Sequence, residues 1–275
     1  MKKFVLLLVP FFLVSFRPQP PELSWTAQGD SITYLNDHPN ETGNRITKGY
    51  MTRVAERLPR LHFINQGHNG WTVVRIAKEI EKLGLEKSDV YTVFLGTNDW
   101  WHAEPLGTIQ DYTDQTGTGT VYGSYRIIIN KLRSLNDQAT IVLITPMQRS
   151  DFVYINNPHN TATGSYKEKD GQSLAQFADA VKAIGKQEHC KVVDLYGKKS
   201  LSVRHLVKFK RLKDPQTGQY KNYKYSDFVD IPFNPDTDEY PYPVEAIGMT
   251  YDGLHPSDKG YKVITDKLVK IMKKL

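Results

Sequence analysis

Two short polar stretches of this sequence carry the residue types that a serine nucleophile requires. Ser31 follows Gly29 and Asp30 directly after an apolar extended run, and Gly29 permits a sharp exit from a strand. Asp252 and His255 lie three residues apart near the other end of the chain. A serine hydroxyl attacks an ester when a base, a group that orients the base and donors for the oxyanion surround it. These residue types therefore indicate acyl transfer, although a Gly-Asp-Ser sequence is also an ordinary turn.

The spacing of Asp252 and His255 suits a base and its orienting partner. Gly253 permits a turn that folds the Asp252 carboxylate back onto the imidazole, where it would fix the tautomer and stabilise the imidazolium. Pro256 keeps the backbone of His255 extended and opens the final helix. We therefore predict Ser31 as the nucleophile, His255 as the base and Asp252 as its partner.

Donors for the oxyanion are expected at three positions. They are the backbone N–H of Ser31, the backbone N–H of Gly70 and the side-chain amide of Asn98. Gly70, Asn98 and also the base His255 have plainer alternatives. The alternative for Gly70 is the turn into a helix, that for Asn98 is an ordinary loop residue, and that for His255 is a surface histidine. Their joint occurrence favours the catalytic interpretation. Apart from Asp252 and His255, no histidine and carboxylate have the sequence spacing of a pair of metal ligands. We therefore expect neither a metal nor a cofactor.

The elements that position these residues alternate along the chain. Strands are predicted at 23–27, 62–65, 90–95, 141–144 and 191–195, and helices at 50–58, 73–83, 125–135, 174–184 and from Pro256 to Leu275. Strands separated by helices predict a parallel sheet that is covered on both faces. In such sheets the functional residues lie at the carboxyl ends of the strands. The segments 29–31, 65–70 and 96–99 should therefore lie side by side.

In this order, the polar segments resemble the four blocks of the SGNH hydrolases, also called GDSL esterases. The blocks are Gly29-Asp-Ser31, Gly70 within 65–70, Gly96-Thr-Asn98-Asp99 and Asp252-Gly-Leu-His255-Pro. The resemblance implies a three-layer α/β/α flavodoxin-like sandwich with a five-stranded parallel sheet, and ester hydrolysis through an acyl-serine. It implies the roles already given to Ser31, Gly70, Asn98, Asp252 and His255. The long stretch before Asp252 departs from a compact member of the family.

That stretch, 197–250, contains five tyrosines and several prolines but no sustained helical period. We interpret it as an irregular excursion of a single domain that covers 22–275. Its aromatic side chains either cover a small core of their own, which we favour, or stack on sugar rings.

Three further side chains are candidates for substrate contact. Trp100 and Trp101 follow the Asn98 block directly, and His68 lies just before Gly70. Packing of the loop is the alternative for the two tryptophans, and exposure to solvent is the alternative for His68.

The amino terminus predicts export. Lys2 and Lys3 precede the apolar run 4–16, and a proline-rich junction follows. The segment 1–21 is therefore interpreted as a secretory signal and its junction, which would direct the protein to the periplasm or the exterior of a bacterium. An uncleaved signal anchor, the alternative, would be its only membrane contact. The single cysteine, Cys190, excludes an intrachain disulfide.

The composition and the charge of the chain limit the classes of partner that we expect. Charged residues make up 24% of the chain, and the net charge is +6. The lysines and arginines are mostly scattered, which indicates a solvated basic surface, with acidic glycans or anionic lipid as other partners of such a surface. No nucleic-acid-binding motif is present, so nucleic acid is not expected as a partner.

These observations predict an exported serine esterase that acts on short acyl esters, above all acetyl esters, of carbohydrate. The partner would be a small-molecule or glycan ester. A lipid acylhydrolase is the alternative, but it would need a longer apolar pocket, and the loops 100–124 and 146–170 are polar. A non-catalytic glycan-binding protein on the same scaffold is a further alternative. The intact set of Ser31, Asp252 and His255 disfavours it.

Overall fold

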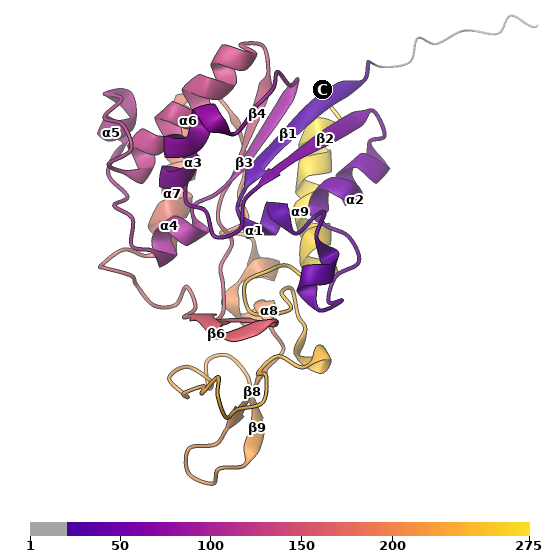
Figure 1. Cartoon of the computed structure of the whole chain (residues 1–275), viewed down its shortest axis with the longest axis vertical. Coiled ribbons are helices and arrows are strands. Elements are labelled where there is room, and N and C mark those ends of the chain that lie inside the picture. The colour runs from indigo at the N-terminus through magenta and orange to yellow at the C-terminus, as the bar shows by residue number, and fades with distance from the viewer. Residues whose placement is uncertain (1–20) are drawn as a thin grey trace, which may run out of the picture.

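A five-stranded parallel sheet forms the centre of the protein (Figure 1). The computed structural model describes residues 21–275, so the secretory signal predicted at 1–21 lies outside the described residues except for its last position. The strand order is β2-β1-β3-β4-β7. The strands are β1 (Leu23–Gly29), β2 (Leu61–Gly67), β3 (Val90–Phe94), β4 (Thr140–Ile144) and β7 (Lys191–Val193). All five residues of the central strand β3 are buried, as expected where helices cover both faces of a sheet.

Helices cover the two faces of the sheet and complete the three layers. On one face, α3 (Val73–Glu79), α5 (Ile109–Thr113), α6 (Val121–Leu135) and α7 (Leu174–Gln187) share one hydrophobic core with the sheet. On the other face, α2 (Tyr50–Arg57) and α9 (Asp258–Met272) share a second core with it. Within residues 21–275, no helix has the length and apolar character needed to cross a bilayer. The α/β/α sandwich with its five-stranded parallel sheet is the fold that the sequence predicts.

The boundaries of several elements differ from those that periodicity predicts. Both β1 and β2 extend two residues further, and they stay in register to the pair Gly29 and Gly67. The helix predicted at 73–83 ends as α3 and continues as the 3-10 turn η2 (Ile80–Lys82). The final helix stops at Met272, so Leu275 lies beyond its last turn and is 39% exposed instead of facing the core.

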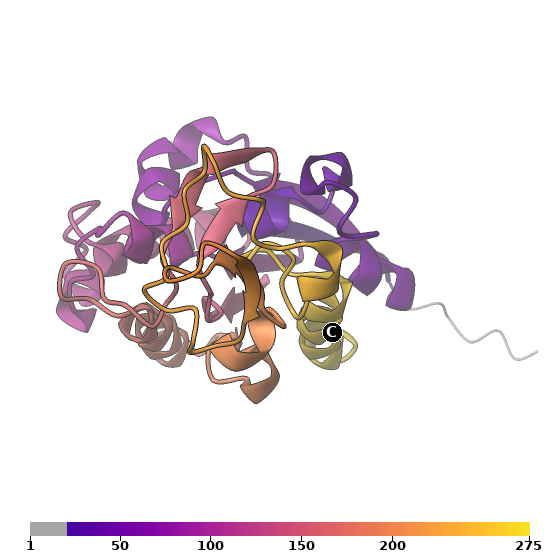
Figure 2. The same ribbon diagram turned by 90° about the horizontal axis from the view of Figure 1, so that it is seen from below.

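Two small antiparallel hairpins lie beyond the carboxyl ends of the sheet (Figure 2). The first consists of β5 (Phe152–Tyr154) and β6 (Asn157–Ala162), and the second of β8 (Lys210–Lys213) and β9 (Tyr220–Tyr223). The sequence did not predict either hairpin. In the first, β6 has mostly exposed polar residues, so it lacks the alternation of a half-buried strand.

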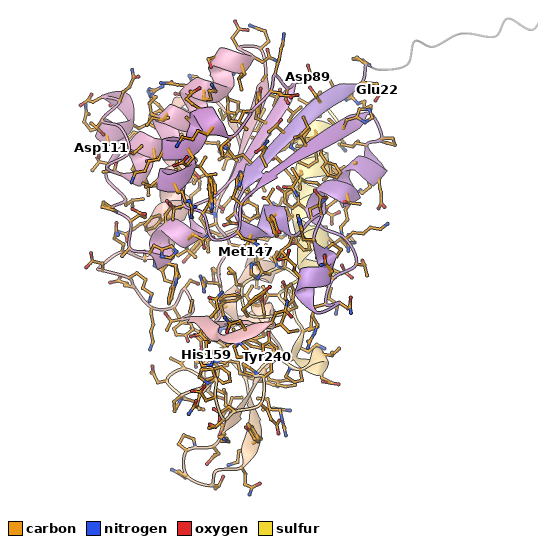
Figure 3. The ribbon with its side chains drawn as sticks, in the orientation of Figure 1. Glu22, Asp89, Asp111, Met147, His159 and Tyr240 are labelled. Carbon is orange, nitrogen blue, oxygen red and sulfur yellow. The ribbon has the colours of Figure 1, made fainter. Side chains whose placement is uncertain are left out.

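The excursion at 197–250 has a hydrophobic core of its own. It also contains α8 (Val203–Leu206) and the 3-10 turns η3 (Lys199–Leu201) and η4 (Val244–Ala246). Phe228 and Tyr242 are fully buried in this core together with Val153 of the first hairpin, and Tyr223, Tyr225 and Tyr240 pack against it. These tyrosines therefore cover the excursion's own core, which is the alternative that the sequence favours. Figure 3 shows Tyr240 and His159 beyond the sheet, where the excursion meets the hairpin.

Gly29 closes β1 at a point that has no room for a side chain. A Cβ at this position would lie 2.1 Å from the hydroxyl oxygen of Thr33 and 3.1 Å from the carbonyl oxygen of Phe94. Thr33 cannot easily yield, because its hydroxyl is 3.0 Å from that of the buried Tyr50. The tight turn sets the position of the next helical turn, α1 (Ser31–Tyr34).

We predict that Gly29→Ala lowers the free energy of unfolding by about 1–3 kcal/mol, because the extra methyl group overpacks this turn. Urea unfolding of the two proteins measures the change. Gly119→Ala is the matched control, since a Cβ at Gly119 meets no atom within 4 Å. Equal unfolding free energies for Gly29→Ala and Gly119→Ala would contradict the prediction.

Candidate active site

Ser31 is the first residue of α1, at the carboxyl end of β1. Asp30 caps this turn, and its carboxylate accepts a hydrogen bond from the backbone N–H of Ile32 at 3.0 Å. The hydroxyl of Tyr261 in α9 donates to the carbonyl of Ile32 at 3.0 Å. The turn that carries the Ser31 hydroxyl is thus fixed both at its cap and by a helix from the end of the chain.

The loop before α9 holds the carboxylate and the imidazole together. One oxygen of Asp252 accepts hydrogen bonds from the backbone N–H groups of Leu254 at 3.0 Å and His255 at 2.7 Å. Gly253 has φ +93°, and a Cβ there would lie 1.9 Å from the carbonyl oxygen of Asp151. Only glycine fits a turn with this conformation and this close approach.

Ser31, His255 and Asp252 form a continuous hydrogen-bonded chain. Nε2 of His255 lies 2.8 Å from the Ser31 hydroxyl oxygen, and Nδ1 lies 2.7 Å from the second carboxylate oxygen of Asp252. Asp252 is fully buried and His255 is 5% exposed. With Nδ1–H directed at the carboxylate, Nε2 is free to accept the serine proton, as a general base must.

Two aromatic rings hold the imidazole of His255 in place. Tyr251 stacks on it with ring centroids 5.9 Å apart, and Phe152 of the first hairpin meets it edge to face at 5.4 Å. The hairpin itself is tied to this loop, because the backbone N–H of Val153 donates to the carbonyl of Asp252 at 3.2 Å. The packing restricts the rotation of the ring and so keeps Nε2 aimed at Ser31.

The three predicted oxyanion donors lie around one cavity. Ser31, Gly70 and Asn98 all line it. The amide of Asn98 donates one N–H to the carbonyl of Trp71 at 3.0 Å, which leaves its second N–H for a ligand. Asp99, the next residue, accepts hydrogen bonds from the backbone of Val73 at 2.8 and 3.0 Å. Asn98 and the loop that contains Gly70 are therefore held together at the first turn of α3.

The cavity has a volume of about 260 Å³ and contains both Ser31 and His255. Its apolar wall consists of Leu35, Trp101, Phe152, Tyr154, Ala162 and Leu254. Its polar wall includes Glu41, Asn69, His102, Arg149 and Asn160. Sequence reasoning missed most of the apolar wall. Phe152 and Ala162 lie over the site because they pair in the first hairpin, which the sequence did not predict.

Two of the three predicted substrate contacts do not reach the cavity. Trp100 is fully buried, and its indole N–H donates to the carbonyl of Gln172 at 3.0 Å, so it packs inside the protein. His68 stacks on Trp71 with centroids 4.3 Å apart, and it is not among the cavity residues. Only Trp101 lines the cavity as predicted. Trp100 does not reach the cavity because helix α4 (Thr97–Trp101) turns it toward the core, and His68 does not reach it because its ring lies against Trp71.

Two further carboxylates are buried beside the site. Burial raises the pKa of Asp30 to about 6, although the N–H of Ile32 and the charge of His255 oppose the rise. Burial raises the pKa of Asp99 to about 7, against the backbone hydrogen bonds from Val73 and Val74. Among residues 21–275, no group of three or more histidine, cysteine and acidic side chains could hold a metal ion.

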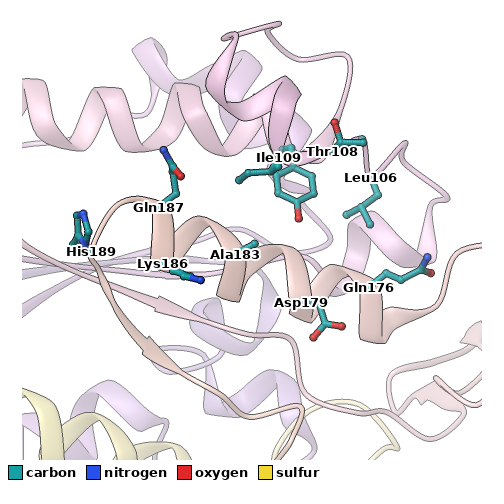
Figure 4. A pocket seen from close by; sticks show the side chains of 11 residues that line it. Leu106, Thr108, Ile109, Gln176, Asp179, Ala183, Lys186, Gln187 and His189 are labelled. Carbon is teal, nitrogen blue, oxygen red and sulfur yellow. The ribbon is translucent and has the colours of Figure 1, made fainter.

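A second hollow, of about 760 Å³, lies between α7 and the segment 106–109 (Figure 4). Ile109, Asp179, Lys186 and His189 are among its lining residues, and none of the three hydrogen-bonded site residues is. The hydrogen-bonded chain of Ser31, His255 and Asp252 lies at the other cavity.

Comparisons with known proteins agree with this geometry. The model of the GDSL-like lipase/acylhydrolase family matches residues 27–263. A crystal structure of a possible lipase from Chitinophaga pinensis DSM 2588 is 60% identical in sequence, covers 92% of this chain and 98% of its own, and superposes with a TM-score of 0.91. No curated protein sequence matches the chain significantly.

More distant solved structures share the fold. An acetyl xylan esterase, AlAXEase, is 20% identical over 90% of this chain and 98% of its own, with a TM-score of 0.53. An acetylxylan esterase from Geobacillus stearothermophilus is 18% identical over 91% of this chain and 94% of its own, with a TM-score of 0.51.

We predict that His255→Ala lowers kcat for an activated ester by about 10⁵-fold or more, and that Asp252→Asn lowers it less, by about 10⁴-fold. Removal of the imidazole leaves no base for Ser31, whereas an amide in place of the Asp252 carboxylate only disturbs the tautomer. Steady-state rates with p-nitrophenyl acetate measure both effects, and circular dichroism checks that the variants are folded. A His255→Ala protein that retains the wild-type rate would exclude His255 from the reaction.

We also predict that Asp30→Asn changes how stability depends on pH. Because the pKa of Asp30 is about 6 in the folded protein and 3.8 normally, the folded state binds more protons between these values. The free energy of unfolding therefore falls as pH rises from about 4 to above 6, by up to about 3 kcal/mol from this group. The amide of the Asp30→Asn variant cannot ionise, and its oxygen can still accept from Ile32, so the variant should lack this fall.

Urea unfolding at pH 4 and pH 7.5 measures the effect as the difference between the two proteins, in which the titrating groups that do not interact with Asp30 cancel. The same pH dependence in both proteins would show that Asp30 does not titrate in this range.

Proposed function

This chain belongs to the GDSL-like lipase/acylhydrolase family, and we propose that it is an exported serine esterase that removes short acyl groups, above all acetyl, from carbohydrate esters. The hydrogen-bonded chain from Asp252 through His255 to Ser31 carries the proposal for the reaction. The volume and charge of the cavity support a short acyl group, and the lysines and apolar run at residues 2–16 support export.

The reaction follows from the positions of the three side chains. The Ser31 oxygen attacks the ester carbonyl carbon while Nε2 of His255 takes the hydroxyl proton. The oxyanion lies among the N–H groups of Ser31, Gly70 and Asn98. His255 then gives its proton to the departing alcohol, which leaves an acyl-serine. Water, deprotonated by His255, hydrolyses this intermediate and the proton returns to Ser31.

The preference for a short acyl group rests on the walls of the cavity. A long alkyl chain gains about 0.8 kcal/mol per methylene only where it meets apolar surface. Here the guanidinium of Arg149 and the side chains of Glu41 and Asn160 share a cavity of about 260 Å³ with the apolar wall. An alkyl chain that lies against polar side chains such as these forfeits that gain.

Carbohydrate as the alcohol part is supported by the aromatic side chains at the cavity and by export. Trp101 and Tyr154 both line it. Two solved structures with this fold are named as acetylxylan esterases, and at 20% and 18% identity they support the fold alone. Leu35, Phe152 and Leu254 favour a second candidate, a lipid acylhydrolase, because they supply the apolar surface that a longer chain needs.

An acyl-length series separates these two candidates. We predict that kcat/KM for p-nitrophenyl esters falls or stays level from acetate to octanoate. Ser31→Ala, which should abolish the rate with every ester, is the control for hydrolysis at another site. A rise of tenfold or more toward octanoate corresponds to about 1.4 kcal/mol in favour of the longer chain. That outcome would replace the acetylesterase by the lipid acylhydrolase.

A further inference from the structure

One charged side chain of the cavity has no role in the acyl transfer. Arg149 lines the cavity with Ser31 and His255 and is 1% exposed. Its Nε and Nη2 atoms are buried, and neither makes a hydrogen bond within residues 21–275. Buried polar groups are nearly always hydrogen-bonded, and a guanidinium carries five N–H donors. A ligand that enters the cavity can therefore supply the partner for these donors.

The carboxylates whose charge acts on Arg149 are already engaged elsewhere. Asp252 is bound to His255 at 2.7 Å, and Asp151 is bound to the ammonium of Lys210 at 2.7 Å. The third, Asp30, accepts the backbone N–H of Ile32. They attract the cation at a distance without saturating its donors.

Aromatic rings hold the guanidinium where it is. Its central carbon lies 5.6 Å from the ring centroid of Trp100, 5.3 Å from that of Trp101 and 5.9 Å from that of Phe152. Burial lowers the pKa of Arg149 to about 10, so the side chain remains a cation at neutral pH. The cavity thus contains a fixed, charged and unsaturated planar fork, which matches the geometry of a carboxylate.

We propose that Arg149 binds a carboxylate on the alcohol part of the substrate, which makes the substrate an O-acylated acidic sugar of the uronate type. The inference rests on the proposed esterase function and specifies its substrate class. Arg149 is then a specificity-determining residue of the same site.

The carboxylate is assigned to the alcohol part of the substrate because Phe152 packs near both His255 and Arg149. Its ring is 5.4 Å from that of His255 and 5.9 Å from the Arg149 guanidinium. His255 protonates the departing alcohol, so the alcohol leaves on the side of the cavity where His255 lies. The net charge acts in the same direction, because it is +6 for the whole sequence and still +3 without Lys2, Lys3 and Arg17 of the predicted signal, and so attracts a polyanionic glycan.

The alternative is that Arg149 only balances the charges of Asp30 and Asp252. In that case the enzyme would not distinguish an acidic sugar ester from a neutral one. Glucuronate and glucose differ at the carboxylate alone, so their acetylated methyl glycosides form a matched pair of substrates. The corresponding uronamide keeps the shape and removes the charge.

For the wild-type protein we expect kcat/KM to be at least tenfold higher for the acetylated glucuronoside than for the glucoside, and the uronamide to lose this advantage. We also expect methyl glucuronoside, and not methyl glucoside, to inhibit hydrolysis of p-nitrophenyl acetate competitively. Equal kcat/KM values without such inhibition, or an advantage that the uronamide retains, would overturn the proposal without any variant.

Variants then assign the effect to this residue. In Arg149→Gln and Arg149→Met the ratio of the two kcat/KM values should fall to near one, mainly through KM for the acidic ester. Arg75→Gln removes the same charge from an exposed guanidinium over Trp71, outside the cavity, and should keep the ratio. A ratio that survives in a folded Arg149 variant would overturn the assignment. Failure of the esterase function itself is distinguishable, since p-nitrophenyl acetate would then not be hydrolysed at all.

Discussion

The hydrogen bond between the Ser31 hydroxyl and Nε2 of His255 joins two residues that are 224 positions apart in the sequence. Its length of 2.8 Å depends on how firmly each of the two residues is held. The sheet and the Gly29 turn fix one end, and the loop before α9 fixes the other. Tyr261 connects the two, because α9 starts directly after the His255 loop and its tyrosine hydroxyl bonds the turn of Ser31. A shift of α9 along the sheet would therefore move base and nucleophile together.

Asp151 shows why the excursion at 197–250 belongs to the active site although it contributes none of the cavity residues. Its carboxylate binds Lys210 of the excursion and the N–H of Gly164, and its carbonyl accepts the hydroxyl of Tyr242. Burial alone would raise the pKa of Asp151, but the ammonium of Lys210 holds it below its usual value, so the carboxylate stays charged. The backbone N–H of the adjacent Ser150 donates to the carbonyl of Gly253 at 2.8 Å. This hydrogen bond joins the segment around Asp151 to the loop that carries His255.

The sequence predicts those parts of the site that depend on local chemistry. Ser31, Asp252 and His255 are recognisable because a turn glycine accompanies each end and because parallel strands bring their carboxyl ends to one edge. The walls of the cavity could not be predicted in the same way. Phe152 reaches the site through an unpredicted hairpin, and the position of Arg149 depends on three aromatic rings from two different segments. Trp100 was misplaced because the sequence does not show which face a five-residue helix buries.

The buried charges around Ser31 explain why this wall would discriminate between substrates more sharply than an apolar one. A buried guanidinium without a partner destabilises the empty enzyme, and a ligand that supplies the carboxylate removes this cost on binding. A neutral alcohol part of the same shape leaves the donors of Arg149 unpaired, so it is rejected by the loss of hydrogen bonds rather than by size.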